Sequence, residues 1–246
     1  MEWRDEGIIL AVRGHGETSA IAEVFTAEHG RALGLIRGGR SRQMRPVLQP
    51  GNAVHLTWRA RLEEHLGHIT LEPTALRAGF IIENALRLSG LGSLTALAQV
   101  LPEREPHRKL YDAMRIVLEA IDHDEVWPAL LVRWEMGLLD ELGFGLDLSK
   151  CASTGTGDNL IYVSPKSGKA VSAGAGAPYK ARLLKLPPFL KGSGAATREE
   201  VQSGFALTGY FLERDVFAPR NMGMPQAREM LLQALAKSSA AVKEGT

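Results

Sequence analysis

The sequence contains one cysteine, Cys151, among 246 residues. A single thiol cannot form an intramolecular disulfide, and such sparse use of cysteine is typical of proteins from a reducing cytoplasm. A structural zinc site needs four ligands, and neither a second thiol nor a downstream histidine is available to complete one around Cys151. We therefore expect a small buried thiol beside a turn, and no bound zinc or other cofactor.

Long apolar runs are also missing. No stretch approaches the roughly 20 apolar residues that a membrane-spanning helix needs. Residues 1–6 lack the basic start and apolar core of a signal peptide. The sequence therefore predicts a cytoplasmic protein with no membrane partner.

Familiar catalytic patterns are absent too. The sequence has no Gly-x-Ser-x-Gly elbow and no phosphate-loop signature. None of its histidines forms a metal-binding pair at helical spacing, and acidic pairs such as Glu199–Glu200 are typical of caps or solvated faces. We predict that the protein is not an enzyme, although a site assembled from scattered residues stays a rival hypothesis.

The most informative absence is local: no Asp or Glu occurs between His29 and Leu62, although the whole chain carries 29 basic and 28 acidic residues. Guanidinium groups form forked contacts with phosphates, and a cluster of them can follow a nucleic-acid backbone. The glycine-rich loop 38–45 is the strongest candidate, because glycines let backbone amides approach an anion. Solvated surface charge is the alternative. The predicted DNA-binding residues are Arg31, Arg37, Arg40, Arg42, Arg45, Arg59 and Arg61.

The first eighty residues have the pattern of β structure. Five short runs separated by turn signals favour a small closed barrel, either an OB-fold or an SH3-like barrel. Alternation places Trp58 on the inner face and Arg59 and Arg61 on the outer one, so that their charges could converge on one surface. We therefore predict Trp58 to be a core residue. The predicted strands are 7–12, 20–26, 32–36, 53–58 and 65–71.

After Pro73 the apolar residues recur at intervals of three and four, which is the spacing of an amphipathic helix. Asp124 is the expected N-cap of the helix that Gly143 ends. Residues 81–150 carry 7 basic against 12 acidic residues, and residues 151–246 carry 12 against 7, so the segments could have different partners. The predicted helices are 75–89, 93–101, 107–121, 124–142, 197–217 and 225–239, with a short strand and turn at 162–168.

Arg133 is unusual because it lies in an otherwise apolar helix. One interpretation is an ion pair with Glu135 or a more distant Asp. The functional alternative is a cation at the rim of an apolar groove that receives the acidic, hydrophobic end of a peptide.

Several segments resemble, in the same order and over nearly the whole chain, the bacterial recombination mediator family RecO, closest to its alphaproteobacterial branch. The resemblance implies an α+β multidomain fold: a five-stranded OB-fold β-barrel and a mainly α-helical domain with a small irregular zinc-finger-like insertion. The similar segments are 3–10, 24–26, 29–31, 34–42, 48–51, 101–107 and 207–212.

The domain boundaries that we expect are 1–78 for the OB-fold, 79–150 for the helical domain, 151–182 for the zinc-finger-like module and 183–246 for C-terminal helices packing on the helical domain. Many relatives carry two Cys-x-x-Cys pairs in the module. This chain has Cys151, Thr154, Ser172 and Ala175 in their place, so zinc is not carried over from the family.

The resemblance also implies a function. It predicts binding of single- and double-stranded DNA, annealing of complementary strands, and help from RecR in loading RecA onto single strands coated by the binding protein SSB. The acidic tail of SSB would bind near Arg133, RecF is a further candidate partner, and the protein would be associated with the nucleoid. An RNA-binding OB-fold module on a helical scaffold is the alternative.

Overall fold

The structure, a computed structural model, describes residues 1–62, 65–192 and 194–243, and side chains as far as residue 237. Its contacts divide the chain into two compact units, Met1–Leu118 and Glu119–Thr246, and we describe each unit by itself.

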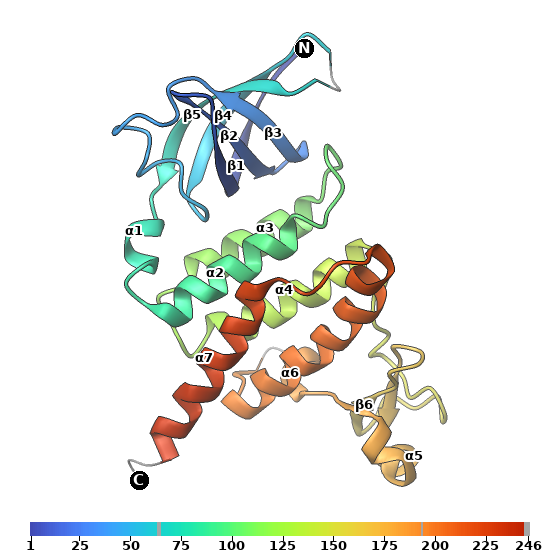
Figure 1. Cartoon of the computed structure of the whole chain (residues 1–246). Helices are drawn as coiled ribbons and strands as arrows, with labels where there is room; N and C mark the ends of the chain where they lie inside the picture. Colours follow the sequence, from blue (N-terminus) through green and yellow to red (C-terminus); the bar gives the residue numbers. More distant parts are fainter. Residues whose placement is uncertain (63–64, 193, 244–246) are drawn as a thin grey trace. The chain divides into compact units, whose positions relative to one another are not determined.

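The first unit begins with a closed five-stranded barrel (Figure 1). Around the barrel the strands follow the order β1-β2-β3-β5-β4; β3 and β5 pair in parallel and the other neighbours are antiparallel. This is the arrangement of an OB-fold, so the predicted fold class is confirmed and the SH3-like alternative is set aside. The strands are β1 Glu2–His15, β2 Ser19–Thr26, β3 Gly30–Ile36, β4 Ala53–Arg59 and β5 Gly67–Ala75.

The long strand β1 closes the barrel because it pairs on both sides. Its first half pairs with β4 and its second half with β2, and Gly7 has partners in both. A Cβ at Gly7 would lie 2.4 Å from a methyl of Val24, so only glycine lets the strands approach here. A bulge between Ile9 and Ala11 bends the strand at the same place.

The barrel interior is filled by alternate side chains of the five strands. Trp58 is 2% exposed, and its indole N–H donates to the carbonyl of Leu33 at 3.0 Å. The prediction that Trp58 belongs to the core is therefore confirmed. The other core residues of the barrel are Ile9, Ala20, Ala22, Val24, Ile36, Leu48, Val54, Leu56 and Ile69.

Three helices complete the first unit: α1 Ala78–Ile81, α2 Ala85–Ala98 and α3 Arg108–Glu119. The helical pattern predicted over 75–89 and continuing over 93–101 corresponds largely to α2, which runs unbroken through residues 90–92. The structure interrupts the helix at residues 82–84 instead, between α1 and α2. Gly90 and the neighbouring Leu91 are buried, and this packing offsets the low helix propensity of glycine. Asn84 caps α2 by accepting from the N–H groups of Leu86 and Arg87.

The second unit is built around α4 Trp127–Glu141, α6 Arg198–Phe211 and α7 Gln226–Lys243. Pro128 lies in the first turn of α4, as predicted, and Gly143 follows its end with φ +83°. The predicted N-cap is wrong: α4 begins after Val126, which has no side-chain cap. The carboxylate of Asp124 accepts from the indole N–H of Trp127 at 3.1 Å.

A small sheet with the order β7-β6-β8 lies between α4 and α6 in the sequence. Its central strand confirms the short strand predicted near Tyr162. A π-helical segment continues α6. These remaining elements are β6 Leu160–Val163, β7 Ala170–Ser172, α5 Ala173–Gly176, η1 Ala177–Arg182, β8 Leu184–Lys185, η2 Pro188–Leu190, η3 Leu212–Phe217 and η4 Ala218–Arg220.

A buried ion pair joins the helices of the second unit. Glu135 on α4 is fully buried and receives two hydrogen bonds from the guanidinium of Arg228 on α7, at 2.8 and 2.9 Å. Arg228 also donates to the carbonyl of Phe205, and the hydroxyl of Thr208 donates to Glu135. The predicted pair between Arg133 and Glu135 is therefore wrong, because Glu135 faces the interior and Arg133 does not.

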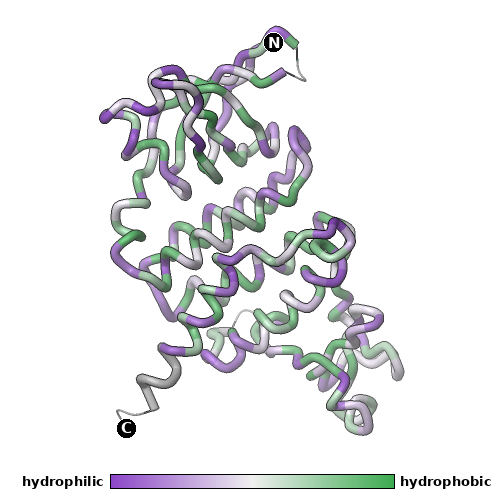
Figure 2. The backbone as a smooth tube through the Cα atoms, in the orientation of Figure 1, coloured by the Kyte–Doolittle hydropathy of each residue, from purple (hydrophilic) through white to green (hydrophobic). Residues whose placement is uncertain are grey.

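Within the part of the chain that the structure describes, no helix has both the length and the apolar character needed to cross a membrane. Hydrophilic residues interrupt the apolar ones along the helices (Figure 2).

Candidate nucleic-acid interface

The connection from β3 to β4, residues 37–52, is here called the arginine loop. It is held at its base by Asn52, which is fully buried. The side-chain amide of Asn52 donates to the carbonyls of Pro46 and Val47, and its oxygen accepts from the N–H groups of Arg77 and Ala78. Leu48 of the same loop is packed in the barrel core. The loop therefore has a defined conformation on the barrel.

Four of the predicted DNA-binding arginines lie on the arginine loop or at its start, and all four are exposed: Arg37, Arg40, Arg42 and Arg45. Arg40 is tied to the β1–β2 turn. Its guanidinium donates to the carbonyl of Gly16 at 2.7 Å, and its backbone N–H donates to the carbonyl of Thr18 at 3.0 Å. The other three have no ion pair or side-chain hydrogen bond with any described residue. Their charges are available to an external anion.

A hollow of about 420 Å³ separates the arginine loop from the β1–β2 hairpin. Arg40 and Arg45 contribute cations to its lining. Gly14, Gly16 and Gly39 contribute backbone without side chains. Glycine backbone beside guanidinium groups is a combination that suits a phosphate. The hollow and the exposed arginines around it form the candidate interface.

The other three arginines of the acid-free stretch do not join this cluster. Arg31 pairs with Glu23, and its Nε donates to the carbonyl of Leu101 at 2.8 Å. Arg59 pairs with Glu2 at 2.8 Å, and Glu2 raises the pKa of its guanidinium. Arg61 is exposed at the β4–β5 connection.

The strand directions explain this separation. Because β1 is antiparallel to both β2 and β4, the β1–β2 turn and the arginine loop lie at one end of the barrel. The β2–β3 turn and the β4–β5 connection, which carries Arg61, lie at the other. Figure 1 shows the blue arginine loop on the side of the barrel away from the N-terminus. The seven charges therefore do not converge on one surface.

The sequence interpretation missed Arg13. It is exposed near the end of β1, at the same end of the barrel as the arginine loop. Glu23, which lines the same shallow hollow as Arg13, is paired with Arg31. The predicted strand stopped at residue 12, whereas β1 continues to His15. Extending the first predicted strand beyond residue 12 would have placed Arg13 on the barrel. One acid, the exposed Glu17, lies in the adjacent turn.

Arg133, the predicted SSB-tail residue, is half-buried on α4 of the second unit. Its guanidinium donates to the carbonyls of Phe189 and Gly192, and it lies 5.8 Å from the centre of the Phe189 ring. Carbonyl oxygens do not neutralise the charge, so a cation remains beside an aromatic ring.

The zinc-finger-like module is held by hydrogen bonds. The thiol of Cys151 is 2% exposed and lies 3.4 Å from the hydroxyl of Ser172, whose N–H also donates to the sulfur. Hydrogen bonds from Ser172, and then from Thr154, lower the pKa of the Cys151 thiol to about 6. One thiol and two hydroxyls do not fit the thiolate and imidazole ligand sets of structural zinc.

The chain matches two family models: Recombination protein O N terminal over residues 1–76 and Recombination protein O C terminal over residues 82–222. A protein from Beijerinckia indica named DNA repair protein RecO is 54% identical, covering 97% of this chain and 96% of that protein. Proteins of the same name from Methylocella silvestris and Rhizobium etli are 53% and 50% identical, with 96% and 97% of this chain covered, and 97% and 94% of theirs. With both halves matched and half of the residues identical over nearly full length, this chain belongs to the RecO family.

Proposed function

We propose that this protein acts in DNA repair as a recombination mediator. It binds single- and double-stranded DNA, anneals complementary strands and, with RecR, helps to load RecA onto single strands coated by SSB. RecF is a further candidate partner. The role is one of binding and bringing strands together rather than of a catalysed reaction.

The observation that carries this proposal is the group of exposed arginines on a fixed loop of an OB-like barrel. Arg37, Arg42 and Arg45 have no acidic partner among the described residues. Neutralising phosphates releases counterions and reduces the repulsion between two strands that are brought together. Because phosphates carry no sequence information, this interface would serve any pair of complementary strands.

The first prediction concerns annealing. The protein is expected to accelerate the pairing of complementary oligonucleotides coated with SSB, and addition of RecR is expected to increase its effect on RecA loading. Fluorescence energy transfer between labelled strands measures the first step, and RecA-dependent ATP hydrolysis measures the second. Matched RNA strands serve as a comparison. Equal annealing with and without the protein would contradict the proposal, and a preference for RNA would support the alternative module.

For SSB we propose docking of its acidic, hydrophobic tail beside Arg133. The cation and the adjacent Phe189 ring offer the two chemistries that such a peptide needs. Since Arg133 also contacts backbone carbonyls, the informative variant is Arg133→Ala, with the exposed Arg182→Ala of the same unit as its control.

The second prediction is that Arg133→Ala weakens binding of the SSB tail peptide at least about tenfold, which corresponds to the roughly 1.5–3 kcal/mol of a charged hydrogen bond. Titration calorimetry measures the affinity, and circular dichroism checks that the variant is folded. Arg182→Ala is expected to bind normally. If both variants bind the tail as wild type does, the tail docks elsewhere.

A further inference from the structure

The barrel has a second hollow, at the end opposite to the arginine loop. It measures about 250 Å³ and opens where β1 begins and β4 ends. Open ends of barrels are frequent ligand sites. We call this hollow the aromatic pocket; its lining consists of Met1, Trp3, Glu28, His29, Ala32, Trp58, Arg104 and Pro106.

Three rings stack along one wall of the aromatic pocket. The Trp3 ring lies 4.1 Å from that of His29, with 7° between their planes, and 5.4 Å from that of Trp58, with 11° between them. Trp58 belongs to the core, whereas Trp3 and His29 are only partly buried. The stack thus runs from the buried ring of Trp58 through Trp3 to the partly exposed ring of His29.

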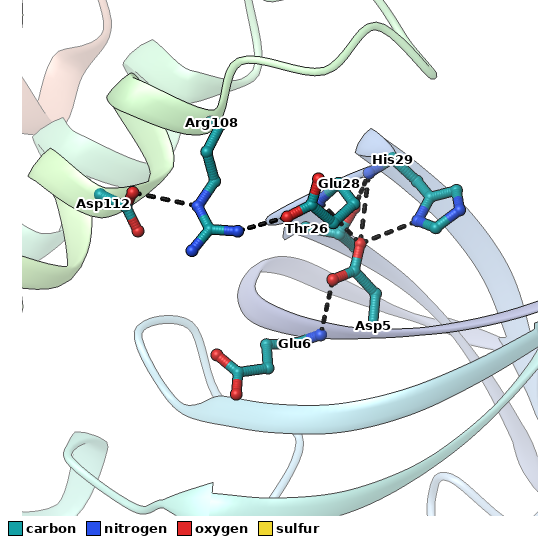
Figure 3. Close-up of polar contacts among 7 residues, drawn as sticks. All are labelled: Asp5, Glu6, Thr26, Glu28, His29, Arg108 and Asp112. Atoms are coloured by element: carbon teal, nitrogen blue, oxygen red, sulfur yellow. Dashed lines mark hydrogen bonds and ion pairs between the residues drawn. The ribbon is translucent and has the colours of Figure 1, made fainter.

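Asp5 fixes the outer ring of this stack. Its side chain is 4% exposed. The carboxylate accepts from the backbone N–H groups of Glu6, Glu28 and His29. It also lies 2.8 Å from the ring Nδ1 of His29 (Figure 3). Because Nδ1 is engaged with Asp5, the second ring nitrogen, Nε2, is left on the side away from it (Figure 3). The imidazole therefore presents one polar edge in a set orientation.

Arg104 also lines the pocket. Its guanidinium lies 5.9 Å from the centre of the Trp58 ring and donates to the carbonyl of His65 at 3.2 Å. Its backbone has φ +64°, which a residue other than glycine rarely adopts. The N–H of Arg104 donates to the carbonyl of Arg31, and a Cβ at Gly30 would lie 1.9 Å from the carbonyl oxygen of Glu105. Close packing on Gly30 thus holds Arg104 in a strained conformation over the pocket.

We propose that the aromatic pocket binds one unpaired nucleobase of a single strand. Aromatic rings and guanidinium planes are the groups on which bases stack in single-strand-binding proteins. The ring nitrogen Nε2 of His29 offers a polar contact to the edge of a base, whereas the carboxylate of Glu28 is already paired with Arg108 (Figure 3). No acid other than Glu28 lines the pocket among the described residues, and Arg61 lies on the connection beside it.

The size of the pocket limits its ligand. Pockets for drug-sized molecules occupy about 300–1,000 Å³, so 250 Å³ suits one ring system and not a base pair. A paired base would have to leave its stack to enter. The inference rests on the proposed DNA binding and adds that this second site distinguishes single strands from duplex.

The test compares Arg104→Gly and Arg104→Lys with wild type. Glycine accepts the positive φ without strain, so the fold is expected to be retained. Lysine keeps the charge but lacks the planar guanidinium. Affinity is measured for a thymine oligomer, for an abasic oligomer with the same number of phosphates, and for duplex DNA.

Wild type is expected to prefer the thymine oligomer over the abasic one about tenfold, in line with the affinity that stacking of a base contributes. Both variants should lose most of this preference, and Arg104→Lys should bind the abasic oligomer and duplex as wild type does. An iodouracil in the oligomer should crosslink to the peptide that carries Trp3 or His29 in wild type.

The outcomes separate the two proposals. If wild type binds no DNA, the proposed function itself fails. If wild type binds DNA but both Arg104 variants keep the full preference for thymine, or if the crosslink maps to another peptide, only the aromatic pocket is wrong. A variant that loses affinity equally for thymine and abasic oligomers would show a phosphate contact at Arg104, and would also overturn base binding.

Discussion

Replacing Arg37, Arg42 and Arg45 together by glutamate is expected to weaken DNA binding on the order of 100-fold at 0.1 M salt and to flatten its salt dependence. Each lost phosphate contact removes about 0.9 from the slope of log affinity against log salt for duplex, and about 0.7 for single strands. Loss of three contacts therefore flattens the slope by roughly 2 to 3. Fluorescence anisotropy over a range of salt concentrations measures it.

Arg40 is left out of this triple variant because its contacts with Gly16 and Thr18 hold the arginine loop in place. The matched control is reversal of three exposed cations of the second unit, Lys166, Lys180 and Arg182. This control is expected to leave the slope almost unchanged. If the control flattens the slope and the loop variant does not, DNA binds the basic C-terminal segment and the candidate interface is misassigned.

The second large effect is expected in the buried ion pair of the second unit. Arg228→Met should lower the free energy of unfolding by about 3–5 kcal/mol, because it leaves the carboxylate of Glu135 buried without its partner. Both side chains are almost completely buried, at 4% and 0% exposure, and their two hydrogen bonds would be lost together. Urea unfolding followed by circular dichroism measures the change.

The double variant Glu135→Leu with Arg228→Met provides the control. Replacing both charges by apolar groups removes the desolvation cost along with the attraction, so most of the lost stability is expected to return. Thr208, which loses its acceptor on Glu135, still donates to the carbonyl of Gly204 at 3.1 Å. A double variant as unstable as Arg228→Met alone would mean that the bulk of the new side chain, rather than the unpaired carboxylate, causes the loss.

The barrel was predictable because its signals are local. Alternating apolar runs and glycine turns occur within each strand pair, and the inward position of Trp58 follows from alternation alone. The unbroken course of α2 through residues 90–92, between the two predicted helical runs, depends instead on contacts that are not local. Two glycines weaken a helix locally, but the packing that keeps α2 continuous comes from the fold and is invisible in the segment itself.

The candidate interface was only partly predictable. An acid-free arginine stretch indicated the loop, but the division of its charges between two barrel ends depends on strand direction. The partners of Arg31 and Arg59 lie 8 and 57 residues away, and that of Glu135 lies 93 away. Pairings over such distances in sequence are set by topology, and an interpretation of spacing along one strand or helix does not reach them.

Asn52 has a consequence for how DNA binding would be driven. A long loop that becomes ordered only on binding loses backbone entropy at that moment, and this loss reduces its affinity. Here the buried side-chain amide of Asn52 joins the loop before β4 to the chain after β5. The backbone entropy of the loop is therefore lost during folding and not on binding. Little backbone then has to become ordered when DNA binds. The arginines of the loop are already held at fixed spacings before the DNA strand arrives. Fast encounter with any strand, rather than slow adaptation to one, is the behaviour that such preorganisation favours.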